Sequence, residues 1–327
     1  MIISRTPFRI SFFGGGTDYP TWVEKHGGAV LSTTFDKYNY ITCRWLPPFF
    51  DHKYRIAYSR LERVLNPLEI EHPAIRAVLN NYESELGMEI HCDDDLPSRS
   101  GLGSSSSFMV GLLHALEALN GRRASPKWLA REAIRYEQSV LGDNVGSQDQ
   151  VAAAFGGLNI IHFRPDGNFK VEPLILSQER KRDFGRYLML FFTGFSRIAS
   201  EIAKSQIDNM DQKERTLHSM RGMVDEGVEI LSSEADLRTF GELLHDAWVK
   251  KRSLSDKISM ESLDAIYDQA RKHGAIGGKL LGAGGGGFML FFVEPDKQES
   301  VRQALANLIY VPFKFESDGA QIVYYRV

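Results

Sequence analysis

The alternation of hydrophobic and polar residues predicts a chain of mixed strands and helices. Residues 2–13 and 88–92 follow the pattern of strands, and residues 108–119 carry apolar side chains at helical spacing. Asn120-Gly121 is a typical helix end. Further strands are predicted at 30–35, 38–45, 54–59, 158–163, 187–193, 288–293, 311–316 and 320–326, and further helices at 72–86, 125–141, 196–209, 213–232, 236–256, 260–273 and 296–308.

Length and composition favour a soluble protein with two domains. The chain has 327 residues, 43% hydrophobic and 25% charged, with a net charge of −3 that argues against nonspecific binding of nucleic acid. A polar stretch with two prolines suggests a boundary near residue 180, and hence domains 1–180 and 181–327. Two cysteines and no long apolar run indicate a cytoplasmic protein without a membrane segment. We expect a monomer or a homodimer.

Residues 95–107 form a glycine- and serine-rich loop between the strand at 88–92 and the helix at 108–119. Backbone N–H groups converge at such a helix start, where the helix dipole favours a phosphate. Serine hydroxyls there can cap the helix or reach a metal ion. The loop is not a Walker motif, because no lysine follows Gly103. On local grounds alone, a flexible serine-rich turn fits equally well.

Two further glycine runs lie far from this loop. Gly14-Gly15-Gly16-Thr17-Asp18 lets the backbone approach a ligand closely, with Asp18 able to accept from sugar hydroxyls, although a tight hairpin explains it too. The second run, 282–287, leads directly into an apolar strand.

Two acidic residues stand out between these runs. Glu137 opposes the dipole near the end of its predicted helix and therefore favours a neighbouring cation, although an exposed glutamate is the commoner explanation. Asp149 precedes a small-residue stretch and Gly156-Gly157.

Together these motifs resemble the GHMP kinases. Residues 97–105 fit the family's central phosphate loop, residues 7–10 and 14–18 its first motif, and residues 282–287 its third. The resemblance covers residues 5–288 and implies the family's two-domain α+β fold. That fold has an N-terminal α/β domain with a left-handed βαβ unit, a C-terminal ferredoxin-like domain, and the active site between them.

The resemblance implies phosphoryl transfer from ATP to a hydroxyl, which depends on positioning and charge neutralisation. Asp149 would accept or orient the hydroxyl proton, Arg9 would keep Asp149 ionised, and Ser105 and Glu137 would hold Mg²⁺. Which serine meets the metal stays open, since Ser106 and Ser107 replace the family's usual small residues. The expected ATP-binding residues are Pro97, Ser100, Gly101, Leu102, Gly103, Ser104, Ser105 and Ser106; the expected substrate residues are Gly15, Gly16, Thr17, Asp18, Ser196, Arg197, Gly284 and Gly285.

Arg9, Asp18 and the surrounding residues resemble the sugar kinases of the family. The runs 12–20, 193–197 and 245–248 extend this likeness to members that phosphorylate the anomeric hydroxyl of heptose 7-phosphate. Fucose- or galactose-type sugar 1-kinases are the alternative, and a non-catalytic sugar sensor is another, which intact Glu137, Asp149 and Ser105 disfavour.

A phosphorylated sugar needs a second phosphate site. Ser196-Arg197, at a helix start, is the first candidate, although Arg197 and Glu201 are also spaced for an ordinary helix-surface pair. Lys250-Lys251-Arg252 is the second, and a solvated basic helix face is the favoured interpretation of that cluster.

Overall fold

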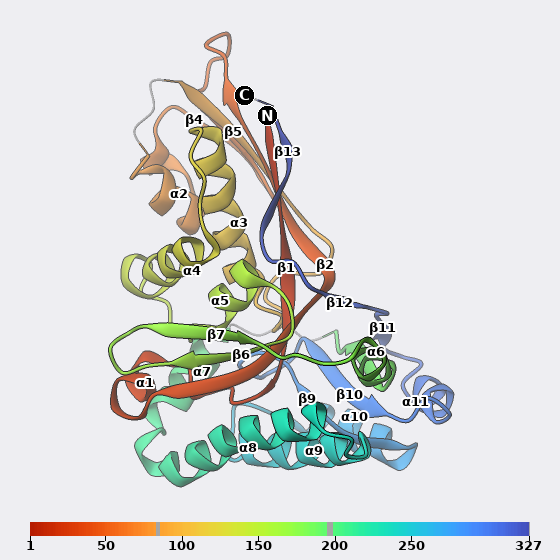
Figure 1. Ribbon diagram of the computed structural model, residues 1–327. Helices are drawn as coiled ribbons and strands as arrows, with labels where there is room; N and C mark the ends of the chain where they lie inside the picture. Colours follow the sequence, from red (N-terminus) through yellow and green to blue (C-terminus); the bar gives the residue numbers. More distant parts are fainter. Residues whose placement is uncertain (83–85, 195–198, 327) are drawn as a thin grey trace.

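A computed structural model describes residues 1–82, 86–194 and 199–326 and contains two β-sheets with helices packed on them (Figure 1). The strands are β1 (Ile2–Phe13), β2 (Gly28–Leu46), β3 (Tyr54–Ala57), β4 (Leu61–Val64), β5 (Gly87–Asp94), β6 (Asn159–Phe163), β7 (Phe169–Pro173), β8 (Leu188–Phe192), β9 (Ala275–Leu280), β10 (Phe288–Val293), β11 (Ile309–Tyr310), β12 (Phe315–Glu316) and β13 (Gln321–Tyr325). The helices are α1 (Pro20–His26), α2 (Pro73–Leu79), α3 (Ser104–Leu119), α4 (Pro126–Ile134), α5 (Gln148–Phe155), α6 (Gln178–Arg186), α7 (Ala199–Asp208), α8 (Glu214–Ser232), α9 (Arg238–Arg252), α10 (Glu261–Lys272) and α11 (Gln298–Ala304). Two short 3-10 helices, η1 (Pro67–Glu69) and η3 (Asp211–Lys213), and one π-helical segment, η2 (Arg135–Val140), complete the list. No helix among these described residues is both long and apolar enough to cross a membrane.

The larger sheet has the order β13-β1-β2-β5-β3-β4, and β6 and β12 also pair with β2. The two strands predicted at 30–35 and 38–45 are one strand, β2, so that prediction is wrong. Pro7 pairs with Tyr38 and Phe8 with Phe35, so the polar residues between them form a bulge without ending the strand. Helices α3 and α5 pack on one face of this sheet, α4 packs on these two helices, and together they bury its core (Figure 1).

The smaller sheet has the order β11-β8-β10-β9, with antiparallel neighbours. Numbered along the chain this order is fourth, first, third, second, with helices after the first and third strands, which is the ferredoxin-like arrangement that the resemblance predicted. Strand β9 was not predicted because glycines interrupt the run of apolar residues in its sequence. Gly277 lies so close to α9 that an added Cβ would meet the Gly241 carbonyl oxygen at 1.9 Å.

The end of the chain crosses from the smaller sheet back to the larger one. The predicted strand 311–316 is therefore wrong in its extent, since β11 pairs with β8 whereas β12 pairs with β2. β13 then lies beside β1, and the backbone N–H of Arg326 donates to the carbonyl of Met1 at 2.9 Å. We keep the boundary near residue 180 as a proposal, although the polar stretch that suggested it forms β7 and α6.

Aromatic side chains join the two sheets. Phe12 at the end of β1 packs on Phe184 of α6 and Phe240 of α9, with ring centroids 5.4 and 5.5 Å away. Phe240 also contacts Phe13 and Phe292. All five rings are buried in one apolar cluster. Such well-packed contacts resist small displacements, so the end of β1 is held in a defined position against the second sheet.

The close approach of α9 to β9 generates the first prediction. Gly277→Ala should destabilise the protein by about 1–3 kcal/mol, because overpacking at this contact forces the helix and strand apart. Gly222→Ala is the matched control: it lies within α8, an added Cβ there meets nothing within 4 Å, and the change should stabilise by about 0.5–1 kcal/mol. Urea unfolding measures both; equal stability of the two variants would contradict the prediction.

Candidate active site

A cavity of about 170 Å³ lies between the two sheets. It is enclosed by β1, the turn after it, the loop before α3, the segment before α5, and parts of α7, α9 and the loop after β9. Its lining includes Arg9, Ser11, Gly15, Gly16, Asp18, Gly101, Gly103, Ser104, Ser105, Ser106, Gln148, Asp149, Gln206, Lys251, Lys279, Gly282 and Ala283. The cavity therefore gathers all three glycine runs seen in the sequence.

The loop before α3 has the predicted order of strand, loop and helix. Gly101 and Gly103 have φ values of 85° and 76°, which a residue with a Cβ rarely adopts. At Gly103 an added Cβ would also lie 3.2 Å from an Asp149 carboxylate oxygen. Leu102 is fully buried and anchors the loop, whereas Pro97 is exposed and does not line the cavity.

The third glycine run packs directly on this loop. An added Cβ at Gly282 would lie 2.4 Å from the Cα of Gly101, and one at Gly287 would lie 2.1 Å from the carbonyl oxygen of Ser100. Gly284 and Gly285 do not line the cavity; the N–H of Gly285 donates to the carbonyl of Ile258 at 2.8 Å. Their places in the lining are taken by Gly282 and Ala283, so this run closes one side of the cavity through its first residues.

Arg9 and Asp149 form a bidentate ion pair at the cavity wall. Arg9 Nε and Nη2 donate to the two Asp149 carboxylate oxygens at 2.7 Å each, and Nη1 donates to the Gly101 carbonyl at 2.6 Å. Arg9 is 4% exposed. Paired contacts of this kind fix orientation as well as charge, and Asp149 lies in the first turn of α5, where the helix dipole also favours a carboxylate.

Asp18 lies in the turn after β1 with only 2% of its surface exposed. It accepts from the backbone N–H of Gly16 at 3.1 Å and of Gln148 at 3.2 Å. Burial, and then the charge of Asp149, raise the pKa of Asp18. Thr17 is buried away from the cavity, because its hydroxyl donates to the carbonyls of Gly14 and Ala29 and closes the turn.

Glu137 is buried in η2, a π-helical segment where the sequence predicted an ordinary helix. Such segments are frequent at functional sites. Burial raises the pKa of Glu137 to about 7, although hydrogen bonds from Ser106, Gln150 and Ser105 lower it in part. The Ser106 hydroxyl donates to Glu137 at 2.7 Å, whereas Ser105 lies at the exposed surface of the cavity. Glu137 is thus not the exposed helix residue that local sequence favoured.

Two buried lysines face the same cavity. Lys251 of α9 donates to the carbonyl of Leu280 at 3.0 Å and also to the carbonyl of Gly282. Lys279 of β9 donates to the carbonyl of Phe12 at 2.7 Å. Burial lowers the pKa of Lys251 to about 7, and burial also lowers the pKa of Lys279 well below its ordinary value. Within the described part of the chain, neither ammonium group forms an ion pair with a carboxylate.

The interpretation of residues 250–252 as a solvated basic face is therefore wrong for Lys251, although Lys250 and Arg252 are partly exposed. Lys279 was not predicted as a site residue. The sequence signal that could have identified it is a single lysine among the apolar residues of its strand. Ser196 and Arg197 lie outside the described residues and stay predictions. Gln206, whose side-chain amide donates to the Ala283 carbonyl at 2.6 Å, had no distinctive sequence signal.

Comparison with known proteins identifies the family. Residues 69–157 match the GHMP kinases N terminal domain, and residues 230–310 match the GHMP kinases C terminal domain. The chain is 30% identical to a D-glycero-alpha-D-manno-heptose 7-phosphate kinase of Campylobacter jejuni over 98% of both chains. The chain therefore belongs to the GHMP kinases.

Other relatives agree with this assignment. A solved structure of a D-glycero-D-manno-heptose 1-phosphate kinase from Bacteroides thetaiotaomicron has a TM-score of 0.81 and 25% identity, covering 100% of both chains. A bifunctional fucokinase/GDP-fucose pyrophosphorylase of Arabidopsis thaliana is 25% identical over 91% of this chain and 30% of its own length. The two-domain GHMP kinase fold expected from the sequence is confirmed.

The burial of Glu137 predicts how the free energy of unfolding depends on pH. Because the folded-state pKa of about 7 lies above the ordinary 4.5, the folded state keeps a proton that the unfolded state releases. Stability should therefore fall as pH rises from about 4.5 to about 7, by up to about 3 kcal/mol from this group, at roughly 1.4 kcal/mol per pKa unit.

Glu137→Gln should remove that part of the pH dependence, measured by urea unfolding at several pH values. Glu132→Gln, at a partly exposed position one turn earlier, is the control and should leave the slope unchanged. Parallel curves for Glu137→Gln and the wild type would contradict the prediction.

Proposed function

We propose that this sugar kinase of the GHMP family transfers the γ-phosphate of ATP to the anomeric hydroxyl of heptose 7-phosphate, giving the 1,7-bisphosphate. Two relatives that resemble it over their whole length act, by name, on heptose phosphates. Their names differ in the position of the phosphate, so heptose 1-phosphate belongs in any substrate panel.

One observation carries the proposal of a phosphorylated acceptor: two buried lysines of the cavity have no carboxylate partner among the described residues. Asp149 is paired with Arg9, whereas Lys251 and Lys279 bond only to backbone carbonyls among the described residues. Buried charges are costly unless they are paired. A dianionic phosphate on the sugar supplies the missing negative charge, and a neutral sugar does not. We assign this role first to Lys251 and keep Arg197 as a further candidate.

The loop before α3 suits the phosphates of ATP, the donor that kinases of this family use. Its glycines leave backbone N–H groups open at the start of α3, a 16-residue helix whose dipole favours negative charge. We assign Ser100, Gly101, Gly103, Ser104, Ser105 and Ser106 to this site. Gly282 and Ala283, which pack against the loop, would close over the transferred group and exclude water.

The residues present also fit Mg²⁺. Glu137 is a buried carboxylate with no basic partner among the described residues, and the hydroxyls of Ser105 and Ser106 lie beside it. Hard cations prefer such oxygen ligands. When bound, Mg²⁺ neutralises phosphate charge. Because Ser106 donates to Glu137 while Ser105 faces the cavity, we propose Ser105 and Glu137 as the residues that hold the metal.

Asp149 and Arg9 are the proposed catalytic pair. Asp149 accepts the proton of the sugar hydroxyl or orients that hydroxyl for in-line attack, and Arg9 fixes the carboxylate and stabilises charge on the moving phosphoryl group. Asp18, Gly15 and Gly16 would contact the sugar, and the nearby Ser11 hydroxyl has no hydrogen-bond partner among the described residues. A fucose-type kinase is the alternative, favoured by the fucokinase relative.

The proposed role of Asp149 generates a kinetic prediction. Asp149→Asn should lower kcat by about 10²-fold or more with little change in the affinity for ATP, because general-base contributions are typically about 10²–10⁴-fold. Asp143→Asn, outside the cavity lining, is the control. Steady-state kinetics and nucleotide binding to the folded variant measure both quantities. Near wild-type turnover in Asp149→Asn would remove this carboxylate from the mechanism.

The proposed phosphate contact of Lys251 is tested by comparing two sugars. Lys251→Met should lower kcat/KM for heptose 7-phosphate by at least about tenfold, the value of one charge-assisted contact of about 1.5–3 kcal/mol, and should change little with unphosphorylated heptose. Lys250→Met, one residue away and partly exposed, should change neither.

Equal losses on both sugars would mean that Lys251 serves ATP or the glycine loop, to which it also donates. Wild-type protein that prefers fucose or unphosphorylated heptose would overturn the choice of substrate.

A further inference from the structure

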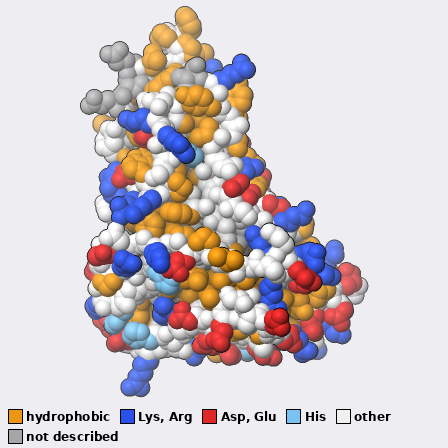
Figure 2. Space-filling view, viewed as in Figure 1, with side chains coloured by type: hydrophobic (Ala, Val, Ile, Leu, Met, Phe, Trp, Pro, Cys, Tyr) orange, Lys and Arg blue, Asp and Glu red, His pale blue; other side chains and the backbone are white. Residues whose placement is uncertain are grey.

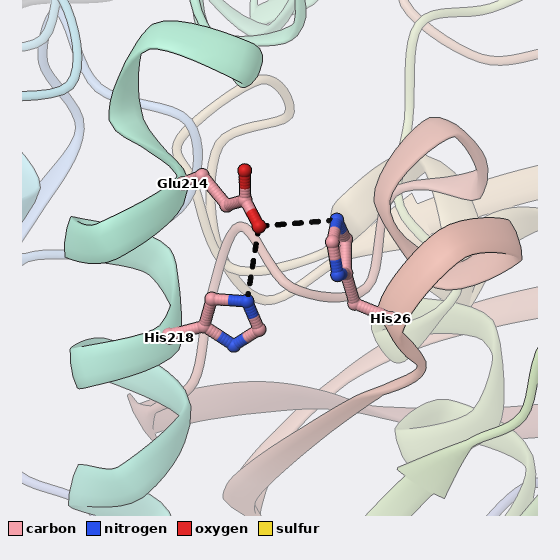
Figure 3. Close-up of side chains that lie close together, drawn as sticks. All are labelled: His26, Glu214 and His218. Carbon is pink, nitrogen blue, oxygen red and sulfur yellow. Dashed lines mark ion pairs between the residues drawn. The ribbon is translucent and has the colours of Figure 1, made fainter.

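A second group of side chains with metal-binding chemistry lies outside the cavity. His26 is the last residue of α1, Glu214 the first residue of α8, and His218 lies one turn further along α8 (Figure 3). A Glu214 carboxylate oxygen lies 3.5 Å from His218 Nε2 and 4.0 Å from His26 Nε2. In the described part of the chain, no other three His, Cys, Asp or Glu side chains come together in this way.

The spacing of these atoms is close to that around a metal ion. One ligand atom from each residue lies within 4.8 Å of the others. Ligand bonds of about 2.1 Å in a tetrahedral zinc site place neighbouring ligand atoms about 3.4 Å apart. The three side chains therefore need to move inward by only a small rotamer adjustment. Two imidazoles and one carboxylate, with a water in the fourth position, form a known ligand set for zinc.

The side chains are held in place by their surroundings. Glu214 and His218 are four residues apart on one helix and so share a face. Trp22, which is 3% exposed, packs against both histidines, with ring centroids 4.2 Å from His26 and 4.9 Å from His218. A fixed indole behind the two imidazoles limits their rotation and reduces the entropy lost when a metal binds.

An ion pair with Glu214 needs only one of the two histidines, whereas a metal ion would use both. The two histidine rings lie 5.0 Å apart and share one carboxylate. If both imidazoles were protonated to pair with Glu214, they would repel each other, whereas a metal ion binds both in their neutral form. Lys25 and Asp211, 3.1 Å apart, already supply a charge pair between α1 and the segment before α8.

The cluster lies at the outer side of the proposed sugar-binding turn. α1 begins directly after residues 14–18, and Leu217, between the two α8 ligands, packs against Gly16, where an added Cβ would meet its Cδ2 at 3.2 Å. On the surface in Figure 2, histidine side chains gather at the lower left, where α1 and α8 lie in Figure 1. His26, Glu214 and His218 are all exposed, so the site is open to solvent, and an ion there would join the two helices that support the turn.

We propose that His26, Glu214 and His218 bind a divalent transition-metal ion of the zinc class, which ties α1 to α8 behind the substrate turn. Imidazole ligands favour Zn²⁺, Co²⁺ or Ni²⁺ over Mg²⁺. The site is thus chemically distinct from the one that Glu137 and Ser105 would form, and it does not depend on the identity of the sugar.

The test uses full-length protein without a histidine tag, freed of metal by chelation and without nucleotide. Titration with Co²⁺ should give the visible absorption of a tetrahedral site at one ion per chain, and Zn²⁺ should displace it and raise the Tm. His218→Ala and His26→Ala should each weaken Zn²⁺ binding at least tenfold in calorimetry and abolish the rise in Tm. Glu214→Gln, which keeps the shape of the side chain, should also weaken binding.

His162→Ala is the matched control. His162 also faces a glutamate, Glu172, at 3.9 Å, but without a second histidine, so its removal should leave Zn²⁺ binding unchanged. The proposal is overturned if wild-type protein binds no Co²⁺ or Zn²⁺, if the variants bind like the wild type, or if binding leaves the Tm unchanged. Each outcome is independent of whether heptose 7-phosphate is the substrate.

Discussion

The guanidinium of Arg9 is the interaction on which the arrangement of the active site depends. It donates to both carboxylate oxygens of Asp149 and to the carbonyl of Gly101, and so joins β1, α5 and the glycine loop before α3. These segments are far apart in sequence, and at this point the guanidinium fixes their separation at hydrogen-bond distance. Because Arg9 is buried, each of its contacts replaces lost hydration, and the loss of one leaves a buried charge partly unpaired.

Four further ionisable groups lie in or beside the cavity, and none of them forms an ion pair among the described residues. Glu137 and Asp18 have raised pKa values because they are buried, and Lys251 and Lys279 have lowered ones for the same reason. Each group becomes more favourable in its charged form when an ion of opposite sign arrives. The proposed function, which gathers nucleotide phosphates, a cation and an anionic sugar in this cavity, would gain affinity from this arrangement at the expense of folding stability. The aromatic cluster between the two sheets supplies part of the compensating burial.

Much of the fold and the main motifs of the candidate site could be predicted from sequence alone. The strand, glycine loop and helix at 88–119 are local features, encoded by alternation, glycine at positive φ and a helical repeat of apolar residues. The same holds for the turn after β1 and for the glycine run before β10. Ordered along one chain, these motifs were enough to predict the GHMP kinase fold and the cavity residues Arg9, Asp18, Ser105 and Asp149.

Other features of the site depend on long-range packing, and only the tertiary structure decided them. A lysine on a helix looks the same in sequence whether it faces water, as Lys250 partly does, or a cavity, as Lys251 does, because the direction depends on how α9 is rotated against β9. Glu137 is buried because α4 continues into a π-helical segment, and the cluster of His26, Glu214 and His218 forms because α1 and α8 meet. Sequence periodicity reports which side of an element is apolar, but it carries no information on which distant element covers it.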